Sequence, residues 1–175
     1  RADPDDPHAL SHDHVSAIWE DRRGDLWIGT HGGGLSRFDR ATGTFTHYRH
    51  DPGDPGSLAG DLVYDVREDR AGRLWVATAN RGLERFDPAT GRFVHHRHDP
   101  NDPATISYDM VWSLYEDRAG RFWVGTLGGG LDRLDPATGR FVRYRGDPAA
   151  PAHLRSNRIA YVGEDETGTL WVGTM

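Results

Sequence analysis

One short segment recurs along this chain at a fixed spacing, and this recurrence limits the possible folds more than any other feature. The segment is Leu26–Thr30, and its tryptophan returns as Trp75, Trp123 and Trp171, each 48 residues after the previous one. Repeats of this length are typical of solenoids, propellers and repeat arrays. The 175 residues therefore hold three full repeats and part of a fourth.

Each full repeat contains four short segments with strand-like alternation, separated by turn residues. In the first repeat these segments are residues 15–19, 26–30, 35–39 and 45–49. Asp and Gly residues predict tight turns inside the repeat, and Asp-Pro loops join one repeat to the next. The fold class predicted is all-β, with β-propeller blades of four antiparallel strands. We expect residues 1–175 to form one propeller segment of about three and a half blades. Blade 1 is expected at about 14–50, blade 2 at about 62–98, blade 3 at about 110–146 and a half blade at 158–175.

The second strand of each repeat is apolar almost throughout, which predicts burial on both faces between neighbouring blades. It carries Gly29, Gly125 and Gly173, or Ala77, and these small residues let neighbouring sheets approach each other. The repeated tryptophans are expected to fill the seams between blades, because a buried indole supplies a large apolar area.

Charge and composition exclude several classes of function. The net charge is −6 with acids and bases interspersed, so a nucleic-acid partner is not expected. The absence of cysteine excludes disulfides and thiolate metal sites. Because no apolar run approaches the length of about 18 residues that a membrane span needs, direct membrane insertion is not expected either.

The string from Asp117 to Thr126, followed by Gly128–Leu131, resembles the two-component regulator propeller repeat. Equivalent strings begin at Asp21, Asp69 and Asp165, and the few departures are Ala77, Asn80 and Arg81. The resemblance implies the periplasmic sensor region of membrane-bound sensor kinases, often hybrid ones. It also implies propellers that usually have seven blades, signalling through dimerisation and, in many members, a response to products of carbohydrate breakdown.

Residues that differ between repeats gather at one predicted end of the blades. A scaffold that repeats elsewhere but varies at one mouth behaves like a binding surface, although relaxed packing at the channel wall gives the same pattern. The candidate ligand-binding residues at this channel mouth are His14, His31, Tyr64, Asp65, Asn80, Arg81, Trp112 and Tyr161. Among them Tyr64, Trp112 and Tyr161 have the aromatic faces that stack on sugar rings, but they could equally pack between blades.

No catalytic residue, metal ligand or cofactor site is predicted. Histidines gather around the fourth strands, where imidazoles could suit zinc or nickel, but a solvated outer edge strand explains them better. The Glu-Asp pairs recur in every repeat at a turn, whereas a catalytic carboxylate pair is needed only once. The histidines in question are His47, His50, His95, His96 and His98.

Three functions remain open. The first is a non-enzymatic sensor of a small molecule or oligosaccharide, with the periplasmic location that the resemblance implies. The second is a propeller lyase or glycosidase, for which His14 and Asp65 are the only polar hints. The third is an assembly scaffold, because the open edge of the half blade invites pairing with another copy or with the rest of a longer propeller.

Overall fold

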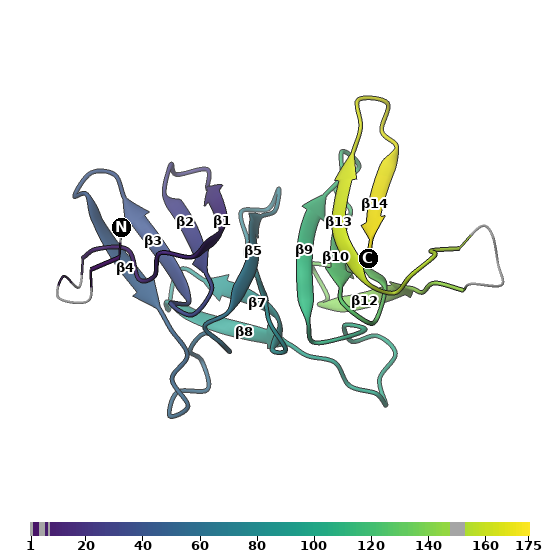
Figure 1. Ribbon diagram of the computed structural model, residues 1–175, viewed down its shortest axis with the longest axis horizontal. Coiled ribbons are helices and arrows are strands. Elements are labelled where there is room, and N and C mark those ends of the chain that lie inside the picture. The colour runs from purple at the N-terminus through teal and green to yellow at the C-terminus, as the bar shows by residue number, and fades with distance from the viewer. Residues whose placement is uncertain (1, 4–5, 7, 148–152) are drawn as a thin grey trace. The chain divides into compact units, whose positions relative to one another are not determined.

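The computed structural model describes residues 2–3, 6, 8–147 and 153–175 (Figure 1). The chain divides into two compact units, residues 1–79 with 84–95 and residues 80–83 with 96–175. Four prolines of the predicted inter-repeat loops lie outside the described residues, namely Pro4, Pro7, Pro148 and Pro151.

The regular structure of the described residues consists of antiparallel β-sheets, and no helix occurs among them. Within each sheet the strands are neighbours in chain order, so the all-β prediction of four-stranded blades is confirmed. The first sheet contains β1 (Val15–Glu20), β2 (Leu26–Thr30), β3 (Leu35–Asp39) and β4 (Thr44–Tyr48). The second contains β5 (Val63–Glu68), β6 (Leu74–Thr78), β7 (Gly82–Asp87) and β8 (Arg92–His96). The third contains β9 (Val111–Glu116), β10 (Phe122–Thr126), β11 (Leu131–Asp135) and β12 (Arg140–Tyr144), and the last only β13 (Ile159–Glu164) and β14 (Leu170–Thr174).

The predicted ends of the first and fourth strands were wrong by one residue. The first strand extends to Glu20, because Glu20 pairs with Leu26 where the hairpin closes. The fourth strand begins at Thr44, which pairs with Asp39, and it ends at Tyr48. Cross-strand pairing sets these limits, and pairing is a property that local composition does not reveal.

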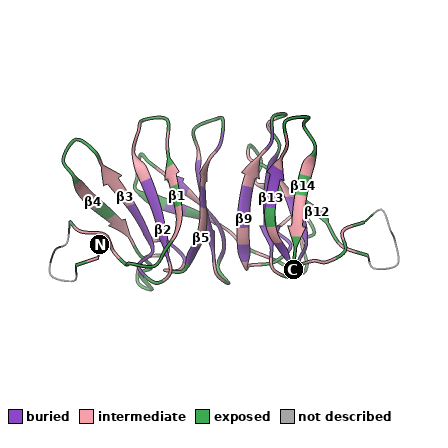
Figure 2. Ribbon diagram, turned by 45° about the horizontal axis from the view of Figure 1, so that its top comes forward, coloured by how far each residue is buried: buried purple, intermediate pink, exposed green. Residues whose placement is uncertain are grey.

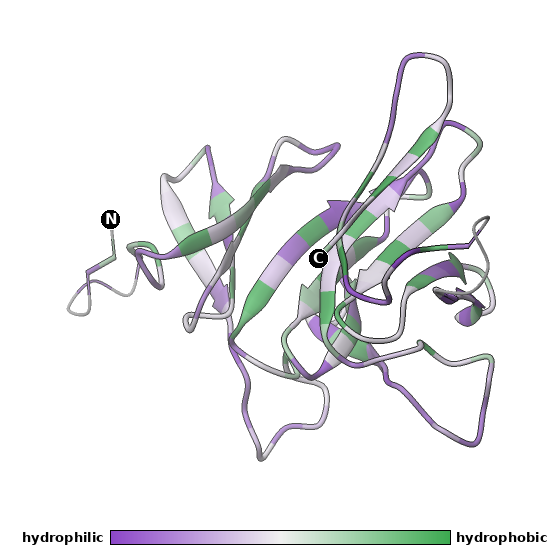
Figure 3. Ribbon diagram, turned by 45° about the vertical axis from the view of Figure 1, so that its right-hand side comes forward, coloured by the Kyte–Doolittle hydropathy of each residue, from purple (hydrophilic) through white to green (hydrophobic). Residues whose placement is uncertain are grey.

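Burial differs between inner and outer strands of the same sheet. All of β6 and β10 is buried, as the continuous apolar character of the second strands predicted. Figure 2 shows the same burial along most of β2. On the outer strand β8, Phe93 is buried between the exposed Arg92 and Val94. Figure 3 shows apolar residues, in green, alternating with more polar residues along strands of the sheets. The inner strands therefore form the middle of a layered structure, and the outer strands face solvent on one side.

An aspartate at the end of each first hairpin organises both the turn and the tryptophan. In the second repeat Asp69 accepts the backbone N–H groups of Ala71 and Arg73 at 2.9 and 3.0 Å, while Gly72 adopts a φ of 79°. Its other carboxylate oxygen accepts the indole N–H of Trp75 at 2.9 Å. The same indole bond occurs in the other repeats, at 2.8 Å in Trp27, 2.9 Å in Trp123 and 2.7 Å in Trp171. The Asp and Gly residues predicted the turn, whereas the only sequence signal of the indole bond is the constant spacing of six residues.

The seam between the two sheets of the first unit is aromatic. Trp27 lies with its ring centroid 5.0 Å from that of Phe86 and 5.7 Å from that of Tyr48. Phe93 completes the group, 5.3 Å from Phe86 and 5.9 Å from Tyr48. These edge and offset contacts add stabilisation to the apolar area that they bury.

Small residues on the second strands allow the sheets to approach closely, as predicted. A Cβ added to Gly29 would lie 2.6 Å from Cγ1 of Val63, on the first strand of the next sheet. In the second unit a Cβ on Gly125 would lie 2.8 Å from Cγ2 of Ile159. Real Cβ atoms do not approach so closely, so glycine is required at these two positions unless the sheets move apart.

The seam within each unit also has a polar contact between turns, which gives Glu68 and Glu164 a structural role. In the first unit Glu68 accepts the backbone N–H of Arg22 at 2.9 Å, and the Arg22 guanidinium donates to the carbonyl of Asp69 at 3.1 Å. In the second unit Arg118 donates its N–H to Glu164 at 2.7 Å, and its guanidinium donates to the carbonyl of Glu166 at 2.6 Å. These carboxylates hold one turn against the next, so they are not free for acid–base chemistry.

The last sheet differs from the others because it has only two strands. The indole of Trp171 on β14 is 60% exposed, whereas that of Trp75 is fully buried. The expectation that every repeated tryptophan fills a seam is therefore wrong for Trp171, because no described residues form a sheet over β14.

Candidate functional site

One end of the blades has the same backbone in every repeat. The residue directly after the second strand donates its N–H to the carbonyl of the residue before the first strand, two positions that we call the mouth pair. The N···O distance is 2.9 Å for His31–His14, 3.0 Å for Ala79–Leu62, 2.9 Å for Leu127–Met110 and 2.9 Å for Met175–Arg158. The scaffold therefore places two side chains together in each repeat while their identity changes.

A second variable position lies at a β-bulge in each first strand. The pairing register of β1 with β2 shifts between Val15 and Ala17, so Ser16 is the extra residue of the bulge. The same shift recurs in the other first strands, at Tyr64, Trp112 and Ala160. Bulges re-aim side chains and are frequent beside functional sites. Variation between repeats is thus concentrated where the backbone releases a side chain from the regular sheet.

Three of the predicted candidates come together in the first unit. The ring centroids of His14 and His31 are 4.3 Å apart, and those of His31 and Tyr64 are 5.2 Å apart with the rings nearly perpendicular. His12, which sequence analysis did not select, joins them because its Nδ1 accepts the backbone N–H of His14 at 3.0 Å. We call His12, His14, His31 and Tyr64 the imidazole cluster. Its only sequence signal is a set of histidines at positions where the other repeats have none.

The electrostatics of the imidazole cluster disfavour positive charge on its central ring. Partial burial lowers the pKa of His31, and the neighbouring His14 and His12 lower it further because they would repel a second imidazolium. His31 is therefore mainly neutral near pH 7, with ring nitrogens that can donate or accept hydrogen bonds.

The remaining candidates have separate surroundings. Asp65 accepts the backbone N–H of Val66 at 2.9 Å and lies 3.5 Å from Nε of Arg67, which occupies its carboxylate locally. In the second unit Asn80 has a positive φ of 57°, and both Asn80 and Arg81 are exposed. Positive φ explains why Asn is tolerated where the first and third repeats have glycine.

The aromatic candidates of the second unit also differ from each other. Trp112 is half-buried at its bulge. Tyr161 is 61% exposed and lies along its own strand, with Cζ 2.7 Å from the place of a Cβ on Gly163. No described contact brings Trp112 and Tyr161 together, so their role as a shared stacking surface stays a prediction.

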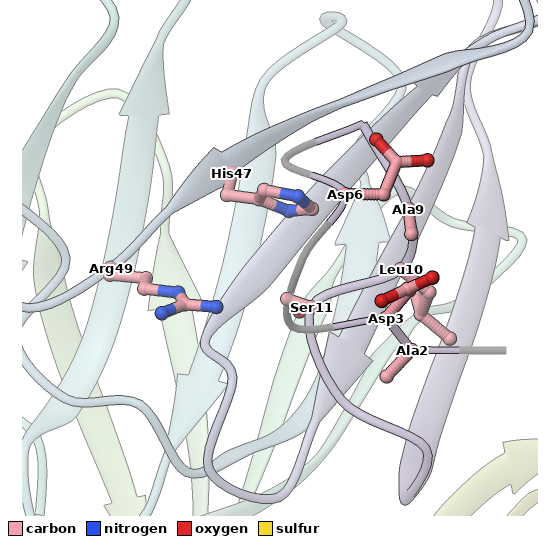
Figure 4. A pocket seen from close by; sticks show the side chains of 8 residues that line it. All are labelled: Ala2, Asp3, Asp6, Ala9, Leu10, Ser11, His47 and Arg49. Carbon is pink, nitrogen blue, oxygen red and sulfur yellow. The ribbon is translucent and has the colours of Figure 1, made fainter.

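A hollow of about 440 Å³ lies beside the N-terminal loop in the first unit (Figure 4). Its lining includes Asp3, Asp6, Ser11, His47 and Arg49. Behind it Oγ of Ser36 lies 2.9 Å from Oγ of Ser11 and 2.9 Å from Nδ1 of His47. Because Ser36 is fully buried, this Ser–His pair cannot present a nucleophile to a substrate, and it ties the loop to the sheet instead.

The positions equivalent to Ser36 and His47 hold different polar residues in the other repeats. In the second repeat His95 lies between the buried carboxylate of Glu84 and the carbonyl of Pro55, 2.7 Å from Nε2. In the third, Arg143 donates to carbonyls of the preceding loop, including that of Thr105 at 3.0 Å. The prediction that the strand-four histidines form a solvated edge is therefore wrong for His47 and His95, because both bond to buried groups. His50 and His98 likewise bond to loop carbonyls, those of Leu58 and Ile106.

Asp132 is the equivalent of Ser36 in the third repeat. Its carboxylate is fully buried, and burial raises its pKa to about 6. The backbone N–H of Ser107, donated to Oδ2 at 2.8 Å, opposes this shift. Asp132→Asn should therefore raise the free energy of unfolding near pH 7 by about 1–3 kcal/mol. The gain should vanish as the pH falls from about 6 to about 4, because a protonated Asp132 no longer carries a buried charge. Urea unfolding of both proteins over this range measures the effect.

Asp87→Asn is the matched control for the sign of this effect. Hydrogen bonds from the Thr90 hydroxyl and the Ala89 N–H lower the pKa of Asp87, so its ionised form stabilises the fold. Its replacement should reduce stability at neutral pH, and the loss should disappear as the pH falls through the lowered pKa. A stability difference for Asp132→Asn that stays constant with pH would contradict the proposed cause.

The described residues contain no group of three or more His, Cys, Asp or Glu arranged to hold a metal ion. No helix among them is both long and apolar enough to cross a membrane. The absence of a metal and of a cofactor stays a prediction.

This chain is similar to a known repeat family and to extracellular domains of two component systems. The model of the two component regulator propeller family matches residues 9–32, 57–80 and 105–128. A comparison with curated protein sequences finds no match. One similar crystal structure is the extracellular domain of a protein assigned as a hybrid two component system from B. thetaiotaomicron. It shares 29% identity over 94% of this chain and 22% of its own, with a TM-score of 0.82.

Two further structures show how far the likeness extends. Another extracellular domain of a hybrid two component system from B. thetaiotaomicron shares 27% identity over 99% of this chain and 23% of its own, with a TM-score of 0.74. Virginiamycin B lyase from Staphylococcus aureus shares 18% identity over 92% of this chain and 49% of its own, with a TM-score of 0.65, which shows a common fold alone. The chain thus spans about a fifth of the length of these two extracellular domains.

Proposed function

Because this chain is built from two-component regulator propeller repeats, we propose that it is a non-enzymatic, ligand-sensing segment of an extracytoplasmic signalling receptor. The ligand is a small molecule or an oligosaccharide. The likeness to extracellular domains of two component systems supports both the sensing role and the location outside the cytoplasm.

The observation that carries this proposal is variation on a constant backbone. The mouth pair keeps its hydrogen bond in four repeats while its side chains change from two histidines to Leu62 with Ala79 and then to Met110 with Leu127. The bulge residue changes in the same way, from Ser16 to Tyr64 and Trp112. A fold that needed these side chains for packing would repeat them, as it repeats the buried tryptophans.

The enzyme alternative has less support. The repeated carboxylates form turns and seam ties, and the Ser36–His47 pair is closed to substrate. The likeness to lyases is a likeness of fold, and function depends on the site and not on the fold.

Binding of an oligosaccharide library to the immobilised chain tests the proposal. We expect saturable binding of at least one glycan, weakened about tenfold or more by Tyr64→Ala or Trp112→Ala, since stacking aromatics carry a large share of such affinity. Val142→Ala, at an exposed position on the outer strand β12, is the control and should bind normally. Turnover of a bound glycan would favour the lyase or glycosidase, and absence of any binding would favour the scaffold.

The open face of the second unit supports a protein partner as well. A hollow of about 470 Å³ there is lined by Trp123, Leu131, Tyr144 and Leu154. In the first unit the equivalent positions beside Trp27 and Tyr48 are filled by Phe86 and Phe93 from the outer strands of the next sheet. We propose that this hollow receives the outer hairpin of a further repeat, from a longer propeller or from a second copy.

The 175-residue chain by itself should therefore associate as its concentration rises. Light scattering after size-exclusion chromatography should show a mass that increases from monomer toward dimer or larger species. Added peptide 79–98, which contains the hairpin of Phe86 and Phe93, should compete with this association because it can fill the hollow. A folded monomer at every concentration, indifferent to the peptide, would rule out the proposed partner.

A further inference from the structure

We infer that the imidazole cluster is a binding site for an anionic group, a carboxylate or sulfate ester on the ligand, and that it binds more tightly as the pH falls. The inference rests on the proposed sensing function and adds the chemical class of the ligand. It concerns only the first unit, where His12, His14, His31 and Tyr64 lie together.

The nearby carboxylates of the protein are directed to other donors. Asp13, between two of the histidines in the sequence, accepts the backbone N–H of Ala2 at 2.6 Å. Asp61 accepts the N–H of His50 at 2.8 Å, and Asp65 accepts that of Val66 at 2.9 Å. In the described part of the chain, no carboxylate forms an ion pair with the three imidazoles. A positive charge on the cluster is therefore available to an external anion.

The fold does not require these histidines. The second repeat has Gly60, Leu62 and Ala79 at the three equivalent positions and keeps the same mouth-pair hydrogen bond, at 3.0 Å compared with 2.9 Å. Three imidazoles placed together also repel one another when protonated, which is unfavourable for the protein alone. Their presence in one repeat only is therefore explained better by a ligand than by packing.

The geometry gives both the charge and the orientation that an anion needs. His14 and His12 are exposed, so they can contact a ligand, while the half-buried His31 lies between His14 and Tyr64. The ring of Tyr64 ends this row and is nearly perpendicular to that of His31. An anion would offset the repulsion among the imidazolium groups, so binding and proton uptake should favour each other.

The test follows the imidazole protons of the 175-residue chain by NMR, in sodium sulfate and in sodium chloride at equal ionic strength. Sulfate should raise the pKa of His14 and of His31, whereas that of the exposed His153, outside the cluster, should change little. Glucuronate should bind about tenfold more tightly at about pH 5.5 than at about pH 7.5, and glucose should not show this dependence.

Variants taken from the second repeat make the test specific. His14→Leu and His31→Ala introduce the residues that the same backbone already carries in that repeat, so both should fold. Each should remove the effect of sulfate, and His153→Ala should leave it unchanged. Equal pKa values in sulfate and chloride would overturn the inference, as would tight binding of nickel or zinc with no response to anions. Neutral glycans that bind at the mouth without pH dependence would also overturn it, while leaving the sensing function intact.

Discussion

Asp69→Ala should unfold the second blade at far lower denaturant concentration than the wild-type chain. The carboxylate of Asp69 is buried, and it accepts two backbone N–H groups, the indole of Trp75 and the guanidinium of Arg73. Its loss leaves the fully buried indole N–H without its acceptor and removes the turn that positions β6. We expect a loss of about 3–5 kcal/mol, which is the cost of several buried donors left unsatisfied at once.

Asp165→Ala is the matched control, because the same bonds exist there in an exposed setting. Asp165 accepts the N–H groups of Thr167 and Thr169 and the indole of Trp171, which is 60% exposed. Water can replace the lost acceptor, so the effect of this substitution should be much smaller. Urea unfolding followed by tryptophan fluorescence compares the two variants, with Trp75→Phe testing the indole bond alone. Equal losses at Asp69 and Asp165 would show that the turn, and not the buried indole, dominates.

His95→Ala should be the second most damaging change. Its Nδ1 is hydrogen-bonded to the carboxylate of Glu84, which is fully buried, and its Nε2 donates to the carbonyl of Pro55 at 2.7 Å. Removing the imidazole leaves the buried Glu84 carboxylate without this partner. It also removes the hydrogen bond to the inter-repeat loop at Pro55. The expected loss is about 3–5 kcal/mol, as for the removal of one partner of a buried pair.

The first repeat supplies the control for His95. There His47 contacts the neutral hydroxyl of Ser36, so His47→Ala should cost only about 1 kcal/mol, as for an ordinary hydrogen bond. Adding Glu84→Gln to His95→Ala should recover part of the lost stability, because an amide is less costly to bury than a carboxylate. Guanidinium unfolding compares these variants with the wild-type chain. If the double variant recovers no stability, the loss comes from the hydrogen bond between His95 and the Pro55 carbonyl alone.

The equivalent polar positions on the third and fourth strands form pairs that the sequence does not reveal. The positions of Ser36, Glu84 and Asp132 are equivalent, and so are those of His47, His95 and Arg143. Read as individual residues they appear as scattered polar side chains on outer strands. Only the pairing of β3 with β4, and of β11 with β12, places each pair side by side under the preceding loop. The composition of the fourth strands alone therefore predicts that their histidines form a solvated edge.

The candidate site was predictable to a similar degree. Variation between repeats identified His14, His31 and Tyr64, because the chain provides its own comparison of equivalent positions. It could not reveal that Tyr64 occupies a bulge, that His12 joins the cluster, or that Tyr161 lies along its own strand. Bulges and ring contacts depend on register and on the neighbouring sheet, which no single repeat encodes.

The sequence by itself determined the all-β blades, the turn positions and the burial of the second strands. A segment such as Leu26–Thr30 that returns every 48 residues predicts a strand in every repeat. Strand periodicity and turn chemistry act over only a few residues, so the sequence reveals them directly. The tertiary structure alone decided which polar groups meet, that Asp69 holds Trp75, and that Glu68 ties one sheet to the turn of the previous one. Such contacts join residues from different strands and sheets, so they exist only after the sheets have packed.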